Sequence, residues 1–574
     1  MLHWRLTHLK HLKIGPFRIR IGTFGLCAAG IVAMGVFMRV LLVAQGWPHT
    51  TIDEGTIGQV AMNIAFHGDH PLFFYGQSYM GSLEAYLAAG VFRLFGVSFF
   101  SLRIGLVFLF ALFLLSMYLL TSLLYTKKLA LFSILLLSLG SGYVIYREVQ
   151  AIGGYSESLL FSSLLLLFAC WLALTAGQVA SPGHRRWRLV AYFAWGAVVG
   201  LGLWSDLIVV PSVLMSGLLL LLCCWRDVRT WAPLCLLLGL IIGGMPLITY
   251  NLHAKHGQDT LSTLIFLYHG GGAYGSVHRL LIRSIISTLL ISLPAISSFN
   301  QICDASSTFL LGGTGPGAVQ CTVTQGAWSL IFIALWLSAV FVAIRTVWKV
   351  AHQTSAKERT FEERQEMFRS CARLAVLLGA GISFMLFAIS PTATLSPYTN
   401  ARYLICVLIA IPAVISPLWD SASASIKSLN RFARVIMVFS KHFLLVFLAF
   451  MFLIGSARTF SEIPGTQALN QQQEDLVQNL LHIGARHIYS DFWSCDRIIF
   501  QSEEQIACSV LTNQLTPQGD RYRPNSVIVQ ADRRASYVFP IETPQAQACA
   551  LRFASSGTAY HHFIFDGYVV YQPE

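Results

Sequence analysis

The chain has 574 residues, of which 55% are hydrophobic and only 11% are charged, and its mean hydropathy is +0.62. Soluble domains carry about 25% charged residues, so this composition excludes a soluble globular protein and predicts a chain that crosses a membrane many times. The formal net charge is +12. The basic residues cluster in every second loop between apolar runs, which is the positive-inside pattern and gives no support for a nucleic-acid partner.

The apolar runs of spanning length predict about eleven transmembrane helices. In chain order these runs lie at 22–45, 104–125, 129–146, 158–179, 189–204, 207–224, 231–250, 326–346, 373–390, 402–419 and 437–456. No small-x-small cleavage site ends the first run, so we expect an uncleaved first helix behind a basic N-terminus. With the N-terminus in the cytoplasm, eleven crossings place the C-terminus outside. The sequence therefore predicts a multi-pass protein of the plasma (inner) membrane with a transmembrane domain over 1–456.

The first outer loop, 46–103, contains two adjacent acids, Asp53 and Glu54, directly after the first helix. Apolar periodicity predicts two helices in this loop, at 55–67 and 82–95, both too short to span and suited to the membrane interface. The Gly/Pro/aromatic stretch between them predicts a loop. A carboxylate at the mouth of a helix bundle is costly unless it is solvated, paired or functional. The two acids alone leave a solvated helix end and a catalytic pair equally open.

A second outer loop, "YREVQAIGGYSES", adds Arg147, Glu148 and Glu157, and Glu84 lies in the first loop. Acids therefore come from two separate loops on one side of the membrane. Arg402 and Tyr403 lie at the outer start of a late spanning helix. Arginine binds phosphate through paired hydrogen bonds, but an arginine at a helix end also snorkels to the headgroups, and both interpretations stay open here.

The outer loop 251–325 has an apolar run at 284–296 that is too short to span easily, and a Gly-rich stretch, "HGGGAYG", that we expect to be a flexible loop and not a phosphate cradle. The outward histidines are expected to be solvated and not to bind zinc, because no cysteine or acid completes a tetrahedral set. These are His67, His70, His253 and His256. Cys303 with Cys321, and Cys495 with Cys508, are candidate disulfides in an oxidising outer space.

The tail, 457–574, becomes polar and predicts a small α/β or α+β domain outside the membrane. We expect a helix over 474–484 and strands over 486–491, 525–530, 535–540 and 563–572. The stretch "SDFW" at 490–493 is expected at a strand end. Its aromatic residues either pack in the core of the domain, which we favour, or stack on a sugar.

The first outer loop resembles that of the C-type glycosyltransferase superfold, nearest to the protein-mannosyltransferase and aminoarabinose-transferase-like branch. In that branch an Asp-Glu pair follows the first helix, then come an "hG" turn, a "Y.G.le" stretch and "lfG.s..sLR". The matching residues here are Asp53-Glu54, His67-Gly68, Tyr79 to Glu84, and Leu94-Phe95-Gly96 to Leu102-Arg103. "ARYLICVLIAIP" is similar to the "RYL...P" motif of a late helix. The loop lacks the Lys-Pro-Pro stretch of the aminoarabinose transferases, which argues against aminoarabinose as donor sugar and lipid A as acceptor.

The resemblance implies an enzyme that transfers a hexose or pentose from a polyprenyl-phosphate carrier to a protein, lipid or glycan at the outer face, with inversion. It implies Asp53 as the general base for the acceptor hydroxyl, and we assign the donor phosphate to Arg402 with Tyr403 and, second, to Arg147. The remaining acids, Glu54, Glu84, Glu148 and Glu157, are expected to orient the acceptor or to support the site.

Branches of the superfold differ in metal use, so a divalent cation stays open. Its candidate oxygen ligands are Asp53, Glu54, Glu148 and Glu157. The rival function is a transporter or flippase for lipid-linked sugars. That class favours ionisable groups within the spans and a repeat relating two halves, and neither feature is evident in this sequence.

Overall fold

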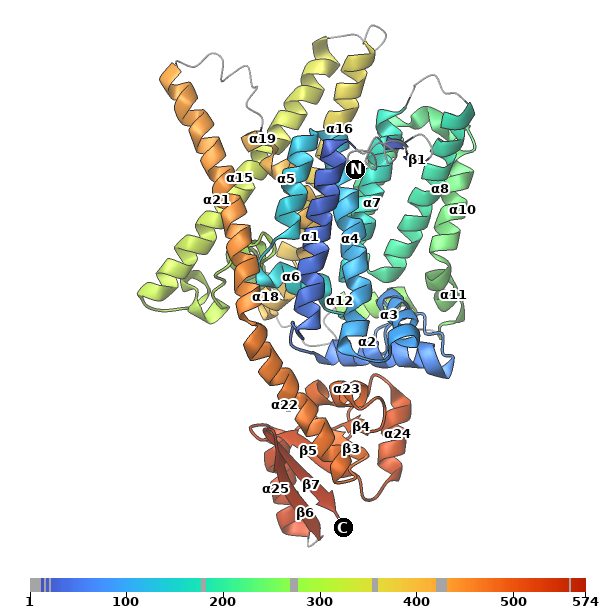
Figure 1. The fold of residues 1–574 in the computed structure, drawn as a ribbon, viewed down its shortest axis with the longest axis vertical. Coiled ribbons are helices and arrows are strands. Elements are labelled where there is room, and N and C mark those ends of the chain that lie inside the picture. The colour runs from blue at the N-terminus through green and yellow to red at the C-terminus, as the bar shows by residue number, and fades with distance from the viewer. Residues whose placement is uncertain are drawn as a thin grey trace, which may run out of the picture.

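The computed structural model describes residues 12–14, 17–19, 22–176, 182–255, 257–268, 277–353, 360–419, 431–556 and 559–574. It shows a bundle of long apolar helices with a small α/β domain attached at one end (Figure 1). Within the described residues, eight helices are long and apolar enough to cross a membrane, or ten if each of two bent pairs counts as one span. This architecture confirms the predicted fold class, a helical multi-pass membrane domain with a small α/β or α+β domain at its C-terminus.

Each of the eleven predicted runs corresponds to helical structure. The long helices are α1 (Thr23–Ala44), α4 (Phe99–Leu124), α7 (Tyr155–Leu174), α8 (Pro182–Ser205), α15 (Pro316–Gln353), α16 (Phe361–Ala388), the 3-10 segment η8 (Ala401–Ala410) with α19 (Ile411–Trp419), and α21 (Arg431–Ser461). The run 207–224 forms a shorter helix that includes α9 (Val210–Cys223).

Two predicted spans are broken. The run 129–146 forms α5 (Lys127–Ser138) and α6 (Gly142–Val149), which meet at 83°. The break contains Gly140, whose φ of +154° favours glycine, and Ser141, whose hydroxyl accepts a hydrogen bond from the Val144 N–H and caps α6. The run 231–250 forms α10 (Ala232–Gly243) and α11 (Met245–His253), which meet at 60° next to Pro246. Proline has no N–H to continue the first helix, so a new one starts there.

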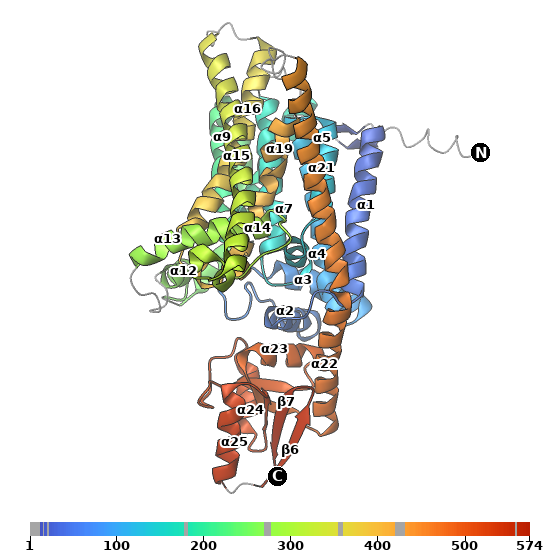
Figure 2. The same cartoon turned by 90° about the vertical axis from the view of Figure 1, so that its left-hand side faces the viewer.

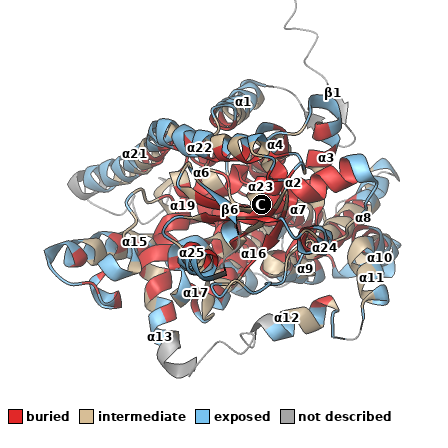
Figure 3. Cartoon of the chain, turned by 90° about the horizontal axis from the view of Figure 1, so that it is seen from below, coloured by how far each residue is buried: buried red, intermediate tan, exposed pale blue. Residues whose placement is uncertain are grey.

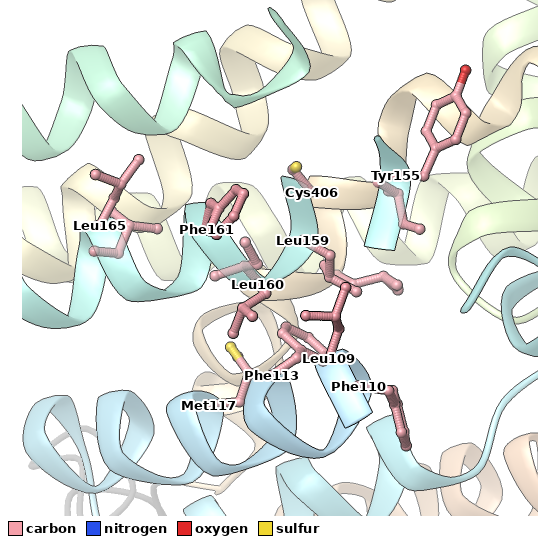
Figure 4. Close-up of a cluster of buried hydrophobic side chains, with 14 of the residues drawn as sticks. Leu109, Phe110, Phe113, Met117, Tyr155, Leu159, Leu160, Phe161, Leu165 and Cys406 are labelled. Atoms are coloured by element: carbon pink, nitrogen blue, oxygen red, sulfur yellow. The ribbon is translucent and has the colours of Figure 1, made fainter. Parts of the chain in front are cut away.

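The core of the bundle lies where α4, α7 and η8 pack together. Phe113 and Met117 of α4 face Leu159 and Leu160 of α7, and Cys406 of η8 lies beside them (Figure 4). These side chains are buried, so the centre of the bundle is a close-packed apolar core. By contrast, α1, α15 and α21 keep most of their apolar surface exposed on the outside of the bundle, as is required of helices that contact lipid (Figure 3).

The first outer loop lies across the end of the bundle that carries the tail. Its two predicted helices are present as α2 (Ile52–Met62), which runs into a π-helical turn η1 (Asn63–His67), and as α3 (Leu83–Phe95). The apolar run 284–296 also belongs to helices that are too short to span, within α13 (Val277–Ser287), η5 (Thr288–Ser292) and α14 (Leu293–Ile296). Helices α11 and α12 (Thr260–Tyr268) lie at the same end as α2 and α3 (Figure 1).

The tail begins with α22 (Ile463–His482), which continues the line of α21 beyond the bundle (Figure 2). Its five-stranded sheet has the order β4-β3-β5-β7-β6, with β3, β4 and β5 parallel and β7 antiparallel to both β5 and β6. The strands are β3 (His487–Ser490), β4 (Ala507–Val510), β5 (Ser536–Pro540), β6 (Tyr560–Phe565) and β7 (Tyr568–Pro573), and the helices are α23 (Phe492–Gln501), α24 (Arg523–Ala531) and α25 (Pro544–Ser556). The predicted α/β or α+β tail is confirmed.

Two predicted strands of the tail are wrong. The predicted strand over 563–572 is divided by a turn at 566–567 into the antiparallel strands β6 and β7. The other predicted strand is a helix. Residues 525–530 lie in α24, with Pro524 in its first turn. Within this segment Val529 is buried whereas Val527 and Ile528 are exposed, so the three β-branched residues do not share an apolar strand face. Proline in the first helical turn favours a helix start. Burial of the face of α24 that carries Val529 then outweighs the strand propensity of the three residues.

Candidate active site

A cavity of about 850 Å³ lies between the transmembrane bundle and the tail. Its walls come from the segment that enters α2, from α6, from the start of η8, from the lower end of α21 and from α23. Three carboxylates and five arginines line it, so positive charge is in excess. The carboxylates are Asp53, Asp304 and Glu462, and the arginines are Arg147, Arg402, Arg458, Arg497 and Arg521. Such a cavity suits a ligand that carries negative charge.

Asp53 lies in the first turn of α2 and lines the cavity. Its Oδ1 accepts a hydrogen bond of 2.8 Å from Nη2 of Arg521, a residue of the tail. The other terminal nitrogen of Arg521 donates to Oγ1 of Thr56 at 2.8 Å, one helical turn beyond Asp53. The guanidinium also lies over the rings of Phe74 and Phe492. The tail therefore supplies the ion-pair partner of the predicted base.

Glu54 occupies a different environment from its neighbour. Its side chain is fully buried, and both carboxylate oxygens accept hydrogen bonds of 2.7 Å from Arg103 of α4. Adjacent residues on a helix point about 100° apart, so one acid can line the cavity while the next enters the protein interior. Glu54 thus fixes α2 to the bundle and is not a lining residue of the cavity.

The other three predicted acids are also buried. Glu148 accepts hydrogen bonds of 3.0 and 2.5 Å from Arg39 of α1. Glu84 accepts a hydrogen bond of 3.0 Å from the N–H of Gly153 and lies next to Glu157. Burial, together with the neighbouring carboxyl group of Glu157, raises the pKa of Glu84 well above its usual value. None of these acids lines the cavity.

Arg147 and Arg402 both line the cavity, as a shared phosphate site requires. Arg147 lies over the rings of Tyr143 and Tyr146 and donates to the carbonyl of Thr399 at 3.3 Å. Arg402 lies over the rings of Tyr155 and Tyr403. Tyr403 therefore contacts the arginine without lining the cavity itself.

The buried Nε of Arg147 and of Arg402 has no hydrogen-bond partner among the described residues. A buried guanidinium N–H without a partner is costly. Both arginines line the cavity, so an anionic ligand there can bind their guanidinium groups.

The four acids suggested for a divalent cation do not form a metal site. Glu54 and Glu148 are each ion-paired with a buried arginine, and Glu157 lies next to Glu84 instead of Asp53. Across the described part of the chain, no group of three or more His, Cys, Asp or Glu side chains is placed to hold a metal ion. The donor set therefore does not fit a cation bound by these residues.

The tail is held in place by close packing of α23 on α2. A Cβ atom at Gly55 would lie 2.5 Å from the carbonyl oxygen of Asp496, and one at Gly58 would lie 2.3 Å from the ring of Phe500. Phe500 is buried, stacks on Phe92 of α3 and meets Phe99 of α4 edge to face. A side chain of the tail thus enters the apolar core of the membrane domain. Figure 2 shows α23 lying beside α2 at this contact.

Sequence reasoning did not find Arg458, Arg497 and Arg521 as cavity residues. The ion pair between Asp53 and Arg521 joins residues 468 positions apart, and no local pattern signals such a contact. His49 was also missed. Its burial and the nearby charges of Arg497 and Arg103 lower its pKa to about 4, so the imidazole is neutral at physiological pH.

The aromatic residues of "SDFW" divide between two roles. Phe492 packs against the core of the tail and also lines the cavity, whereas Trp493 is 69% exposed and lines the cavity. Asp491 caps α23 by accepting a hydrogen bond from the Trp493 N–H at 2.8 Å. The favoured prediction of core packing is therefore wrong for Trp493.

Both candidate disulfides are present, Cys303–Cys321 in the outer loop and Cys495–Cys508 in the tail. Of the outward histidines, His67 hydrogen-bonds Asn63 and lies 3.7 Å from Glu504, and His253 hydrogen-bonds a backbone carbonyl. His256 and the stretch 269–275 lie outside the described residues.

No family model matches the sequence, and no curated protein matches it. Solved structures do match. ArnT from Cupriavidus metallidurans bound to undecaprenyl phosphate superposes with a TM-score of 0.58 at 14% identity, covering 96% of this chain and 98% of that chain. The apo form of the same protein gives a TM-score of 0.54 at 13% identity, covering 95% and 97%.

The Archaeoglobus fulgidus oligosaccharyltransferase in complex with Zn and sulfate matches with a TM-score of 0.50 at 14% identity, covering 94% of this chain and 72% of that chain. Identities this low establish a shared fold and nothing finer. They do not distinguish the mannosyltransferase-like branch from the others, so that assignment stays a prediction. The chain therefore shares the fold of these two proteins, and its cavity is closed on one side by the C-terminal domain.

Proposed function

We propose that the chain is a C-type glycosyltransferase that moves a hexose or pentose from a polyprenyl-phosphate donor to an acceptor hydroxyl. The observation that carries the proposal is one cavity in which Asp53 faces the same space as Arg147 and Arg402. A base and a phosphate site are the two functions that this reaction needs side by side. The fold shared with ArnT, a protein solved with undecaprenyl phosphate bound, supports a lipid-linked donor.

In the proposed reaction the acceptor oxygen attacks the anomeric carbon while Asp53 takes the proton of the acceptor hydroxyl. The bond between the anomeric carbon and the phosphate oxygen breaks, and the electron pair leaves on the polyprenyl phosphate. Arg402 and Arg147 stabilise the negative charge that develops there, and Tyr403 positions Arg402 through contact with its guanidinium. Attack from the side opposite the phosphate inverts the anomeric carbon.

The buried acids have a supporting role in this proposal. Glu54 and Glu148 hold α2 and α6 through ion pairs with Arg103 and Arg39, and these two helices carry Asp53 and Arg147. Precise placement of reacting groups contributes strongly to catalysis, so loss of these ion pairs would affect the rate through position. Glu84 and Glu157 lie next to each other, and Glu84 also holds the segment after α6 by accepting a hydrogen bond from the Gly153 N–H.

We propose that the helices span the plasma (inner) membrane and that the tail and the cavity lie on its non-cytoplasmic side. The starts of α5 and α8, which carry Lys127, Lys128, Arg185 and Arg186, lie at the end of the bundle opposite the tail (Figure 1). Basic residues at that end favour the cytoplasm. The two disulfides at the tail end favour an oxidising compartment.

The decisive test is Asp53→Asn, assayed with a panel of labelled polyprenyl-phosphate sugars on membranes that contain the protein or lack it. General-base catalysis contributes about 10²–10⁴ in rate, so we expect transfer to fall at least a hundredfold with unchanged expression and membrane insertion. Transfer at a near-normal rate would refute Asp53 as the base. Movement of the labelled donor across the bilayer without any glycosylated product would support a flippase instead.

A further inference from the structure

The tail contributes a surface to the cavity that the proposed chemistry does not use. Trp493 and Arg497 are four residues apart on α23, so they lie on one face of the helix, and both line the cavity. Trp493 is 69% exposed and meets Phe492 edge to face. A flat indole ring left exposed in the cavity offers a stacking surface for the apolar face of a sugar ring.

Arg497 provides a positive charge without an ion pair among the described residues. Its Nε is buried and has no hydrogen-bond partner in that part of the chain. Burial also lowers the pKa of this arginine. Arg497 lines the cavity, so a negatively charged ligand there can pair with its guanidinium.

Arg521 connects this surface to the base. Its guanidinium is oriented by Asp53 and Thr56 and lies 5.2 Å from the ring centre of Phe492, the neighbour of Trp493. A ligand that contacts Arg521 is therefore separated from Asp53 by a single side chain. The arginines assigned to the donor phosphate, Arg147 and Arg402, come from the membrane helices instead.

We propose that Trp493, Arg497 and Arg521 form an acceptor subsite for a sugar that carries a carboxylate or a phosphate group. The ring stacks on Trp493, the anionic group binds Arg497 and Arg521, and a neighbouring hydroxyl reaches Asp53. This inference rests on the proposed function and deepens it by naming the acceptor class, an acidic glycan. The tail then selects the acceptor and the membrane helices bind the donor.

The test measures binding to the full-length protein in lipid nanodiscs. The probes are a uronic-acid disaccharide, the corresponding neutral disaccharide, a disaccharide phosphate and labelled polyprenyl phosphate. We expect wild type to bind at least one acidic disaccharide about tenfold more tightly than the neutral one. Arg497→Gln should abolish this preference without changing the binding of polyprenyl phosphate. Arg497→Lys should retain part of it, because the charge remains.

Two further variants complete the design. Trp493→Ala should weaken acidic and neutral disaccharides alike, because it removes stacking and not charge. Arg533→Gln, at an exposed position of the tail outside the cavity, is the matched control and should leave every binding constant unchanged. Comparison of the uronic-acid and phosphate probes identifies which anionic group the subsite accepts.

The inference is overturned if Arg497→Gln binds both classes of disaccharide as wild type does, or if it weakens polyprenyl phosphate by the same factor. It is also overturned if Trp493→Ala leaves the binding of both classes of disaccharide unchanged, since the exposed ring would then have no part in sugar binding and would fit a membrane anchor instead. Failure of the proposed function has a different signature. Acidic disaccharides would bind, while polyprenyl phosphate would not bind and no sugar would be transferred.

Discussion

Asp53 and Glu54 are adjacent in sequence and have separate environments. Asp53 is partly exposed and forms an ion pair with Arg521. Glu54 is buried and accepts hydrogen bonds from Nε and Nη2 of Arg103. A partly exposed ion pair contributes about 1 kcal/mol or less, while removal of one member of a buried pair costs about 3–5 kcal/mol. The two acids should therefore respond differently to neutralisation.

We predict that Glu54→Gln lowers the apparent Tm of the purified protein by several degrees, because it leaves Arg103 charged and unpaired. Asp53→Asn should leave the Tm near that of wild type while it abolishes transfer. Thermal unfolding in detergent, followed by intrinsic fluorescence, measures both. A Glu54→Gln protein that is as stable as wild type yet inactive would assign the catalytic role to Glu54 instead.

Glu84 gives a prediction about pH. Burial and the carboxyl group of Glu157 raise its pKa, so the folded state binds this proton more tightly than the unfolded state does. The contribution of Glu84 to folding stability is therefore complete below the ordinary pKa of a glutamate. It is lost as the pH rises through the raised pKa of Glu84 in the folded protein. Glu84→Gln cannot ionise, and its side-chain oxygen can still accept from Gly153.

The apparent Tm of Glu84→Gln should therefore exceed that of wild type at pH 8, and the difference should shrink towards pH 5. Glu542→Gln makes the same chemical change on the exposed surface of the tail and serves as the control. A Tm difference that is constant across this pH range, or that grows towards acid, would contradict a raised pKa of Glu84 in the folded protein.

At the scale of elements, the contact of α2 with α23 decides where the tail lies. Gly58 leaves room for the ring of Phe500, and a side chain there would overlap the ring. Gly58→Leu should displace α23, lower the apparent Tm and expose the tail to protease, with a cost of about 1–3 kcal/mol from overpacking.

Limited proteolysis of the detergent-solubilised protein measures this effect. Gly90→Leu is the matched control, because a Cβ there meets no atom within 4 Å. The double variant Gly58→Leu/Phe500→Ala should recover part of the protease resistance, since it removes the ring that clashes. Equal sensitivity of the Gly58 and Gly90 variants would show that the tail does not dock on α2.

Local sequence patterns predicted most of the helices, but they did not predict where two of the spans are broken. Apolar length and periodicity found all the long helices as well as α2 and α3, because these features depend on neighbouring residues. The bends at Gly140 and Pro246 were missed, since an apolar run gives the same hydropathy whether it is straight or broken. The helix at 523–531 was mistaken for a strand because three β-branched residues outweighed Pro524.

The candidate site was predictable only where its residues lie near the membrane spans. Asp53, Arg147 and Arg402 each follow or precede a recognisable apolar run, and all three line the cavity. Arg497 and Arg521 lie in a polar tail where charged residues are ordinary. Their position depends on a docking contact across more than 400 residues, such as Thr56 with Asp496, and no sequence period encodes it.

For the whole molecule, the orientation can be tested by cysteine labelling in intact cells. Leu551, which is 73% exposed on α25, should react as Leu551→Cys with a membrane-impermeant maleimide added outside. His352, exposed near the end of α15 at the opposite end of the bundle, should react as His352→Cys only after permeabilisation. The reverse pattern would place the tail and the cavity in the cytoplasm.

Because the tail is the last part of the chain to be synthesised, the cavity can be completed only at the end of synthesis. The ribosome completes every membrane helix before it makes α23, so one wall of the cavity arrives last. Until the tail has docked and Phe500 has packed against α2 and α3, Asp53 has no Arg521 beside it and the cavity remains open. In the orientation that we propose, the tail must cross the membrane before the cavity is complete, so a chain stalled during insertion would hold an unfinished site.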